Sequence, residues 1–152
     1  MARRWGAMAL ATLAIGGCES ISVPIPFLSP NALCSARGVT VDADFPAAGQ
    51  HSCIIGADGG IIVQVDHETT LVEGINPSPW YALRLTSDAA RTVTLTLDYT
   101  DYTHRYAPWI RVSDGAWRKL DDSRITLNDR KTRATLTLDL PQGPTWLAGQ
   151  PI

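Results

Sequence analysis

The sequence comprises 152 residues, of which 45% are hydrophobic and 18% are charged, and its formal net charge at pH 7 is −2. The first 17 residues, which are predicted to be removed, hold two of the 13 basic residues. Eleven basic residues then remain against 15 acidic ones, for a net charge of about −4. This charge excludes a nucleic-acid partner and an acidic disordered tail, and the remaining length fits one domain.

Residues 1–17 have the layout of a secretory signal: a basic start, an apolar run over 7–15, and two glycines before Cys18. The apolar run is too short to form a stable membrane-spanning helix. The string IGGC resembles a bacterial lipobox, so we expect cleavage before Cys18 and lipidation of its thiol. The alternative is an ordinary cleaved signal. Several acyl chains would give a lasting membrane anchor, and Glu19 favours the periplasmic face of the outer membrane of a bacterial cell envelope.

Residues 18–32 are rich in proline and are predicted to form an extended tether between the lipid and a domain over 33–152. A first edge strand broken by proline is the other interpretation. Export places the cysteines in a compartment that permits disulfides. With Cys18 lipidated, Cys34 and Cys53 form an even pair, and a bond between them would act as a hairpin-like staple of about 3 kcal/mol. A free thiol pair is the alternative, and the spacing disfavours a metal site.

The remaining chain alternates apolar and polar residues, which is typical of strands with one face on a core. The clearest run places Val93, Leu95 and Leu97 on one face and threonines on the other. We predict strands over 38–42, 60–65, 80–86, 92–99, 109–113, 117–120, 134–140 and 145–148. Glycine, proline, Asn and Asp turn signals separate them. The expected fold is an all-β, antiparallel two-sheet sandwich of about eight short strands, with a small barrel as the competing closure.

No catalytic motif stands out in the sequence. The three histidines begin no HxxE or HExxH string, no GxSxG is present, and the glycines at 56–60 lack the Lys-Ser/Thr of a phosphate-binding loop. A polar and aromatic stretch over 99–111 remains, because ring faces flanked by charges can bind a sugar or a peptide. Its candidate binding surface is Tyr102, His104, Arg105 and Trp109. The competing interpretation is that Tyr106, Trp109 and Trp117 close one end of the sandwich.

Several segments in a fixed order resemble a known domain: NPSPWYALRLT at 76–86, TVTLTLDY at 92–99, HRY-x-P-W, SDG-x-W, and WLAGQ at 146–150. They resemble the N-terminal β-sandwich of zinc carboxypeptidases of the cytosolic, tubulin-deglutamylating branch and their bacterial relatives. The resemblance covers roughly 60–150. It assigns structural or docking roles to these positions: Asn76, Pro77, Trp80, Tyr81, His104, Arg105, Tyr106, Pro108, Asp114, Gly115 and Trp117.

In such relatives the sandwich packs on a catalytic domain, whose zinc ligands this sequence lacks. The resemblance therefore implies no metal ligand or cofactor in this chain, with zinc only in the missing domain, and no catalytic activity of this chain alone. The first functional hypothesis is a docking domain of an exported metallocarboxypeptidase, truncated or split from its peptidase domain, which predicts an exposed apolar face. The second is a lipid-anchored binding module for glycan or peptide, with its candidate surface concave and open to solvent.

Overall fold

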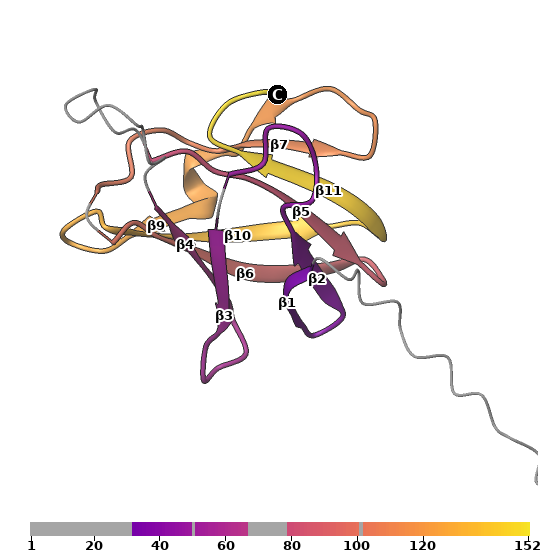
Figure 1. Ribbon diagram of the computed structural model, residues 1–152, viewed down its shortest axis with the longest axis horizontal. Coiled ribbons are helices and arrows are strands. Elements are labelled where there is room, and N and C mark those ends of the chain that lie inside the picture. The colour runs from indigo at the N-terminus through magenta and orange to yellow at the C-terminus, as the bar shows by residue number, and fades with distance from the viewer. Residues whose placement is uncertain (1–31, 50, 67–78, 101) are drawn as a thin grey trace, which may run out of the picture.

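The computed structural model describes residues 32–49, 51–66, 79–100 and 102–152. Within these ranges two sheets pack face to face, as Figure 1 shows, and they confirm the predicted all-β sandwich. Sheet A has the order β1 (Ala32–Ala36), β2 (Val39–Asp42), β5 (Ala82–Ser87), β11 (Gly143–Ala148), β7 (Trp109–Val112) and β8 (Arg118–Lys119). Sheet B has the order β3 (His51–Ile55), β4 (Ile61–Val65), β6 (Arg91–Asp98), β10 (Arg133–Leu140) and β9 (Ile125–Leu127). A short 3-10 helix, η1 (Asp122–Arg124), precedes β9.

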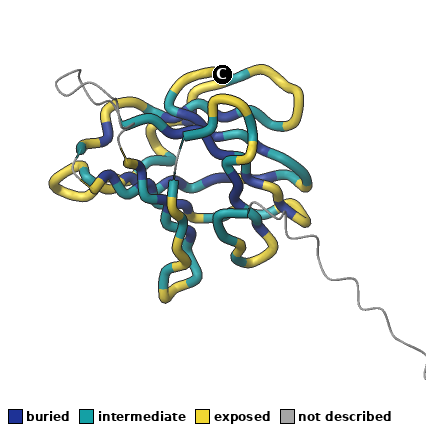
Figure 2. The backbone as a smooth tube through the Cα atoms, in the orientation of Figure 1, coloured by how far each residue is buried: buried dark blue, intermediate teal, exposed yellow. Residues whose placement is uncertain are grey.

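The core lies between the two sheets, where the dark blue segments of Figure 2 face each other. Sheet B contributes inward leucines such as Leu97 and Leu136, and sheet A contributes Leu83, Leu85 and Leu147, all of which are buried. Full burial of such a side chain contributes about 1.5–3 kcal/mol. The alternation that predicted the strands therefore also identifies the residues that hold the sheets together.

Eight of the described strands correspond to the eight predicted ones, with ends that differ by at most two residues. Three strands were not predicted: β1, β3 and β9. β9 spans three residues, and the edge strand β3 is half exposed with no clear alternation. β1 begins at Ala32, one residue inside the predicted tether, and the rest of the tether lies outside the described residues.

One pair of strands departs from the antiparallel pattern, because β4 and β6 are parallel, with Ile61 opposite Leu95. The strand between them in sequence, β5, belongs to the other sheet. The chain therefore leaves sheet B after β4, reverses through sheet A, and returns in the original direction as β6.

A disulfide joins Cys34 of β1 to Cys53 of β3, with the two Cα atoms 5.6 Å apart. β1 is an edge strand of sheet A and β3 is an edge strand of sheet B. The bond therefore links the two layers along one side of the sandwich, and is not a staple within a hairpin.

Candidate functional site

The outer surface of sheet A carries tryptophan and basic side chains that we name the aromatic–cation face. Alternation along β7 directs Trp109 and Arg111 away from the core, while Ile110 between them is buried. Trp146 of β11 lies opposite Arg111, and Lys119 of β8 lies opposite Trp109. The face consists of Trp109, Arg111, Trp117, Lys119 and Trp146.

Each cation of this face lies over a ring. The guanidinium carbon of Arg111 is 4.8 Å from the centroid of the Trp117 ring and 4.7 Å from that of Trp146. The Lys119 ammonium is 5.6 Å from the centroid of Trp109. Such contacts contribute about 0.5–1 kcal/mol when exposed and about 2 kcal/mol when desolvated. Arg111 is thus held between two indoles, which leaves partly exposed rings and cations alternating over neighbouring strands.

An ion pair lies beside the aromatic–cation face, on the next strands of sheet A. Arg84 of β5 lies opposite both Trp146 and Asp42 of β2. Its Nη2 is 2.9 Å from one Asp42 oxygen, and its Nε donates to the other at 3.0 Å. Asp42 is only 2% exposed, and the backbone N–H of Asp44 also donates to it. A guanidinium in this two-point geometry both neutralises and hydrogen-bonds the buried carboxylate.

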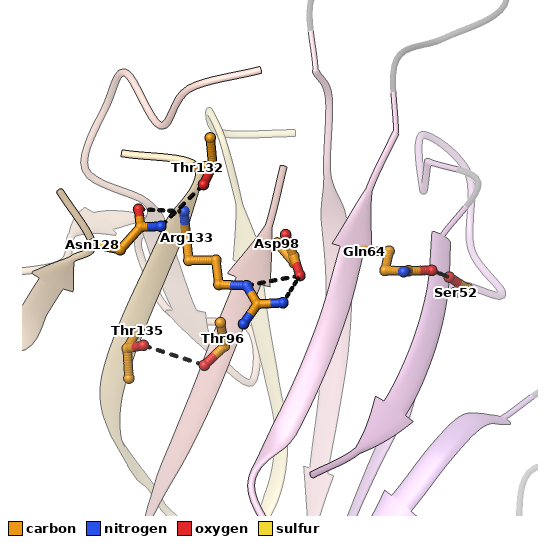
Figure 3. Close-up of polar contacts among 8 residues, drawn as sticks. All are labelled: Ser52, Gln64, Thr96, Asp98, Asn128, Thr132, Arg133 and Thr135. Carbon is orange, nitrogen blue, oxygen red and sulfur yellow. Dashed lines mark hydrogen bonds and ion pairs between the residues drawn. The ribbon is translucent and has the colours of Figure 1, made fainter. Parts of the chain in front are cut away.

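The outer surface of sheet B is different, because its polar groups are bonded to one another across the strands (Figure 3). Arg133 donates from Nε and Nη2 to one Asp98 oxygen, at 2.9 and 2.7 Å. The hydroxyls of Thr96 and Thr135 lie 3.3 Å apart on the same two strands. On β3 and β4, Ser52 and Gln64 form a further cross-strand hydrogen bond, and no tryptophan lies among the described residues of this sheet.

Tyr81, Tyr99 and His104 form a buried polar cluster next to the core. The Tyr99 hydroxyl and His104 Nδ1 are 3.0 Å apart, and the Tyr81 and Tyr99 rings meet edge to face at 6.4 Å. Burial raises the pKa of both tyrosines, and the neighbouring Tyr99 adds to the rise at Tyr81. Burial lowers the pKa of His104. All three groups are therefore held in their neutral forms, which is typical of structural polar residues.

The four residues of the predicted binding surface occupy different environments. His104 is buried and hydrogen-bonded to Tyr99, and Tyr102 packs partly buried against the core. Arg105 is exposed, and Trp109 belongs to the aromatic–cation face. The structure thus does not bring these four side chains together as one open surface.

Among the predicted structural positions, Trp80 is half-buried and its Nε1 donates to the Ala47 carbonyl at 3.1 Å. Pro108 is buried, and its carbonyl accepts the N–H of Leu120 at 2.7 Å. Gly115 closes the turn after β7 by donating to the Val112 carbonyl. Asp114 of that turn and Tyr106 are exposed, the latter to 75%. Asn76, Pro77 and Cys18 lie outside the described residues.

The sequence interpretation did not join Trp146, Arg111 and Lys119 into one face. Trp146 lies between Thr145 and Leu147, both buried, so alternation alone assigns its ring to the outer surface. The sequence pattern does not show that β11 pairs with β7 and that β7 pairs with β8. These pairings bring the residues of the aromatic–cation face together. An outward tryptophan on a strand was the available signal.

The described residues contain no group of three or more His, Cys, Asp or Glu side chains that could hold a metal ion. They therefore offer no fit for the zinc of a carboxypeptidase centre. Within the same residues, no helix is long and apolar enough to cross a membrane.

The sequence matches no known family model and no curated protein. A search of solved structures finds a metallo-carboxypeptidase from Burkholderia cenocepacia, with a TM-score of 0.54 and 13% sequence identity. The chain shares a fold with part of that protein. The likeness covers 72% of this chain and 28% of the other, so this chain spans less than a third of its length. At this level of identity the likeness concerns the fold alone.

Proposed function

We propose that this chain is a non-catalytic accessory domain of an exported zinc metallocarboxypeptidase, and that it docks on the catalytic domain through its aromatic–cation face. The observation that carries the proposal is the group of three partly exposed tryptophans stacked with Arg111 and Lys119. Tryptophan and arginine are the residues most often responsible for binding energy in protein interfaces. The large part of the Burkholderia cenocepacia protein outside the likeness provides a context for such a partner.

The chemistry of the proposed interface differs from the bare apolar face that the sequence hypothesis expected. The exposed large apolar side chains among the described residues come from four separate parts of the chain: Ile54 and Ile55, Tyr106, Leu127, and Ile152. The aromatic–cation face instead offers rings and positive charge, which complement a partner surface with carboxylates between apolar groups. In this proposal the catalytic domain supplies the zinc ligands, and a lipid on Cys18 holds the assembly at the envelope membrane.

The same rings also favour a second candidate function, a stand-alone lipid-anchored module that binds a glycan or a peptide. Trp109 and Trp146 present ring surface on one side of the sheet with cations alongside, and such surfaces stack on apolar ligand faces. A stand-alone module requires no protein partner on this face.

The deciding measurement is the mass of the native protein, recovered from the membrane fraction of its host with an antibody against this domain. A species tens of kilodaltons heavier than the processed chain, or a stoichiometric zinc peptidase that copurifies with it, supports the docking domain. A lone species at the mass of the processed, lipidated chain contradicts docking and favours the binding module.

The role of the face is tested by substitution in the same host. Trp146→Ala should release the peptidase, because it removes the ring that packs on Arg111 at the centre of the face. Thr126→Ala, an exposed position on β9 of sheet B, is the matched control and should retain it. Equal retention by both variants would place the docking surface elsewhere.

A further inference from the structure

One edge of β6 is open at its beginning. β4 pairs with β6 only from Leu95 onward, where Ile61 is its first partner. Residues 91–94 pair with β10 on their other side, and no described strand lies along their β4 side. An unpaired strand edge presents backbone N–H and C=O groups to any extended chain that lies along it.

A cavity of about 210 Å³ runs beside this open edge. The β1–β2 turn and the β3–β4 turn form its walls, and Figure 1 shows the β3–β4 hairpin projecting beyond the body of the sandwich. Ala36, Ile61 and Val93 give the cavity an apolar side. It therefore combines an open backbone edge with a place for an apolar side chain.

Arg37 lies at the rim of this cavity and has no carboxylate partner among the described residues. The Arg37 guanidinium lines the cavity and donates to the Asp58 carbonyl, and no described carboxylate forms an ion pair with it. The guanidinium lies close to Gly59, where an added Cβ would come within 2.8 Å of its Nε, so the absence of a side chain at 59 gives it room. By contrast, the second arginine of the lining, Arg91, is paired with Asp88 and donates to the Arg37 carbonyl.

We name the cavity and the open edge of β6 over residues 91–94 the notch. We propose that this notch binds the carboxyl-terminal residues of an extended peptide. The peptide backbone pairs with the open edge of β6, its last side chain contacts the apolar side, and its terminal carboxylate accepts from Arg37. Strand addition and capture of a chain terminus are established modes of peptide recognition. The proposal is independent of the docking function, because the notch and the aromatic–cation face involve different residues.

The charges at the rim favour a carboxylate over other anions. One unpaired guanidinium matches one negative charge, and a carboxylate can accept two of its parallel N–H donors. The carboxylate of Asp58, which accepts the Gly60 N–H at 3.0 Å, lines the same cavity. Its negative charge repels any anion, but it repels a doubly charged group such as a phosphate about twice as strongly as a singly charged carboxylate.

The test is an NMR titration of the full-length, isotope-labelled protein with the peptide acetyl-Ala-Val-Ala-Leu, as its free acid and as its carboxamide. We expect the acid to perturb the backbone amides of Arg37 and residues 91–94, and to bind about tenfold or more tightly than the carboxamide. Equal affinity for the two peptides, or perturbations that lie away from the notch, would overturn the proposal.

Two further comparisons separate the contribution of Arg37 from that of backbone pairing. Arg37→Gln should abolish the preference for the acid, whereas Arg130→Gln, an exposed arginine in the β9–β10 turn, should keep it. Methylation of alternate backbone nitrogens of the peptide should weaken binding in one of the two positions, because only alternate residues bond to one strand edge. An Arg37→Gln protein that still prefers the acid, or full tolerance of both methylations, would contradict the proposed geometry.

Discussion

The outer faces of the two sheets follow the same alternation but hold their polar groups differently. On sheet B, cross-strand pairs such as Asp98 and Arg133 bond to each other, so their charges and hydroxyls have partners within the sheet (Figure 3). On sheet A, Arg111 lies between two indoles, and the rings keep exposed edges and faces. The first arrangement suits a surface that contacts only water. The second leaves apolar ring surface that gains stability when a partner covers it.

The largest expected effect concerns the buried ion pair of sheet A. Arg84→Ala should lower the free energy of unfolding by about 3 kcal/mol, because it leaves the Asp42 carboxylate buried without its countercharge. Arg133→Ala, which breaks an exposed pair on sheet B, should cost less than about 1 kcal/mol. Urea unfolding of both variants measures the difference. Equal losses would mean that the two faces hold their charges in the same way.

The next expected effect is a dependence of the free energy of unfolding on pH. It originates in His104 and His51, which belong to neither outer face. Burial lowers the pKa of His104 and of His51, so the unfolded chain binds more protons than the folded chain below the usual value of about 6.5. The free energy of unfolding should be constant between pH 8 and 7 and should fall as the pH is lowered through 6.5 to 5.

His104→Gln should reduce this slope, and His51 should contribute to the slope that remains. Denaturant unfolding at a series of pH values provides the measurement, and the Arg133→Ala protein is the control that should retain the full slope. A free energy of unfolding that rises on acidification would contradict the lowered pKa values of these two histidines.

A double-mutant cycle compares the two kinds of cross-strand contact directly. Substitution of Arg111 and Trp146 by alanine, singly and together, should give a coupling energy of about 1 kcal/mol, as expected for a partly desolvated cation over a ring. The same cycle for Thr96 and Thr135 should give about 0.3 kcal/mol. A larger coupling between the threonines would reverse the contrast between the faces.

The smallest expected effect is the response to salt. The exposed pair between Arg124 of η1 and Asp139 of sheet B should weaken in 1 M sodium chloride, because the Debye length falls to about 3 Å. The Arg111 contacts with the indoles, which are partly buried, should change less. Coupling energies measured at low and high salt check both statements.

Much of the fold could be predicted from the sequence because its inward positions are regular. The runs around Leu95 and Leu136 specify long strands and their buried faces without any tertiary information. The parallel pairing of β4 with β6 could not be predicted, because it depends on β5 joining the other sheet. The edge strand β3 was missed because burial, and with it the alternation, is weak there.

The candidate site was less predictable than the fold. Alternation could place Trp109 outside, but not opposite Lys119, since pairing partners are set by sheet order. His104 lies in an aperiodic loop, and its burial follows from the approach of Tyr99, five residues earlier in the sequence. The cavity beside β6 exists because β4 begins opposite Leu95 and leaves the start of β6 unpaired on that side. No local sequence signal marks where β4 begins.

The link between Cys34 and Cys53 has a mechanical consequence. Tension applied to the chain before Ala32 would enter the sandwich at β1, an edge strand whose hydrogen bonds to β2 could open one after another like a zipper. Cys34 is the third residue of that strand, so peeling would stop there and the force would pass through the covalent bond to β3 and sheet B. Load borne by a single edge would then be shared by both layers of the sandwich.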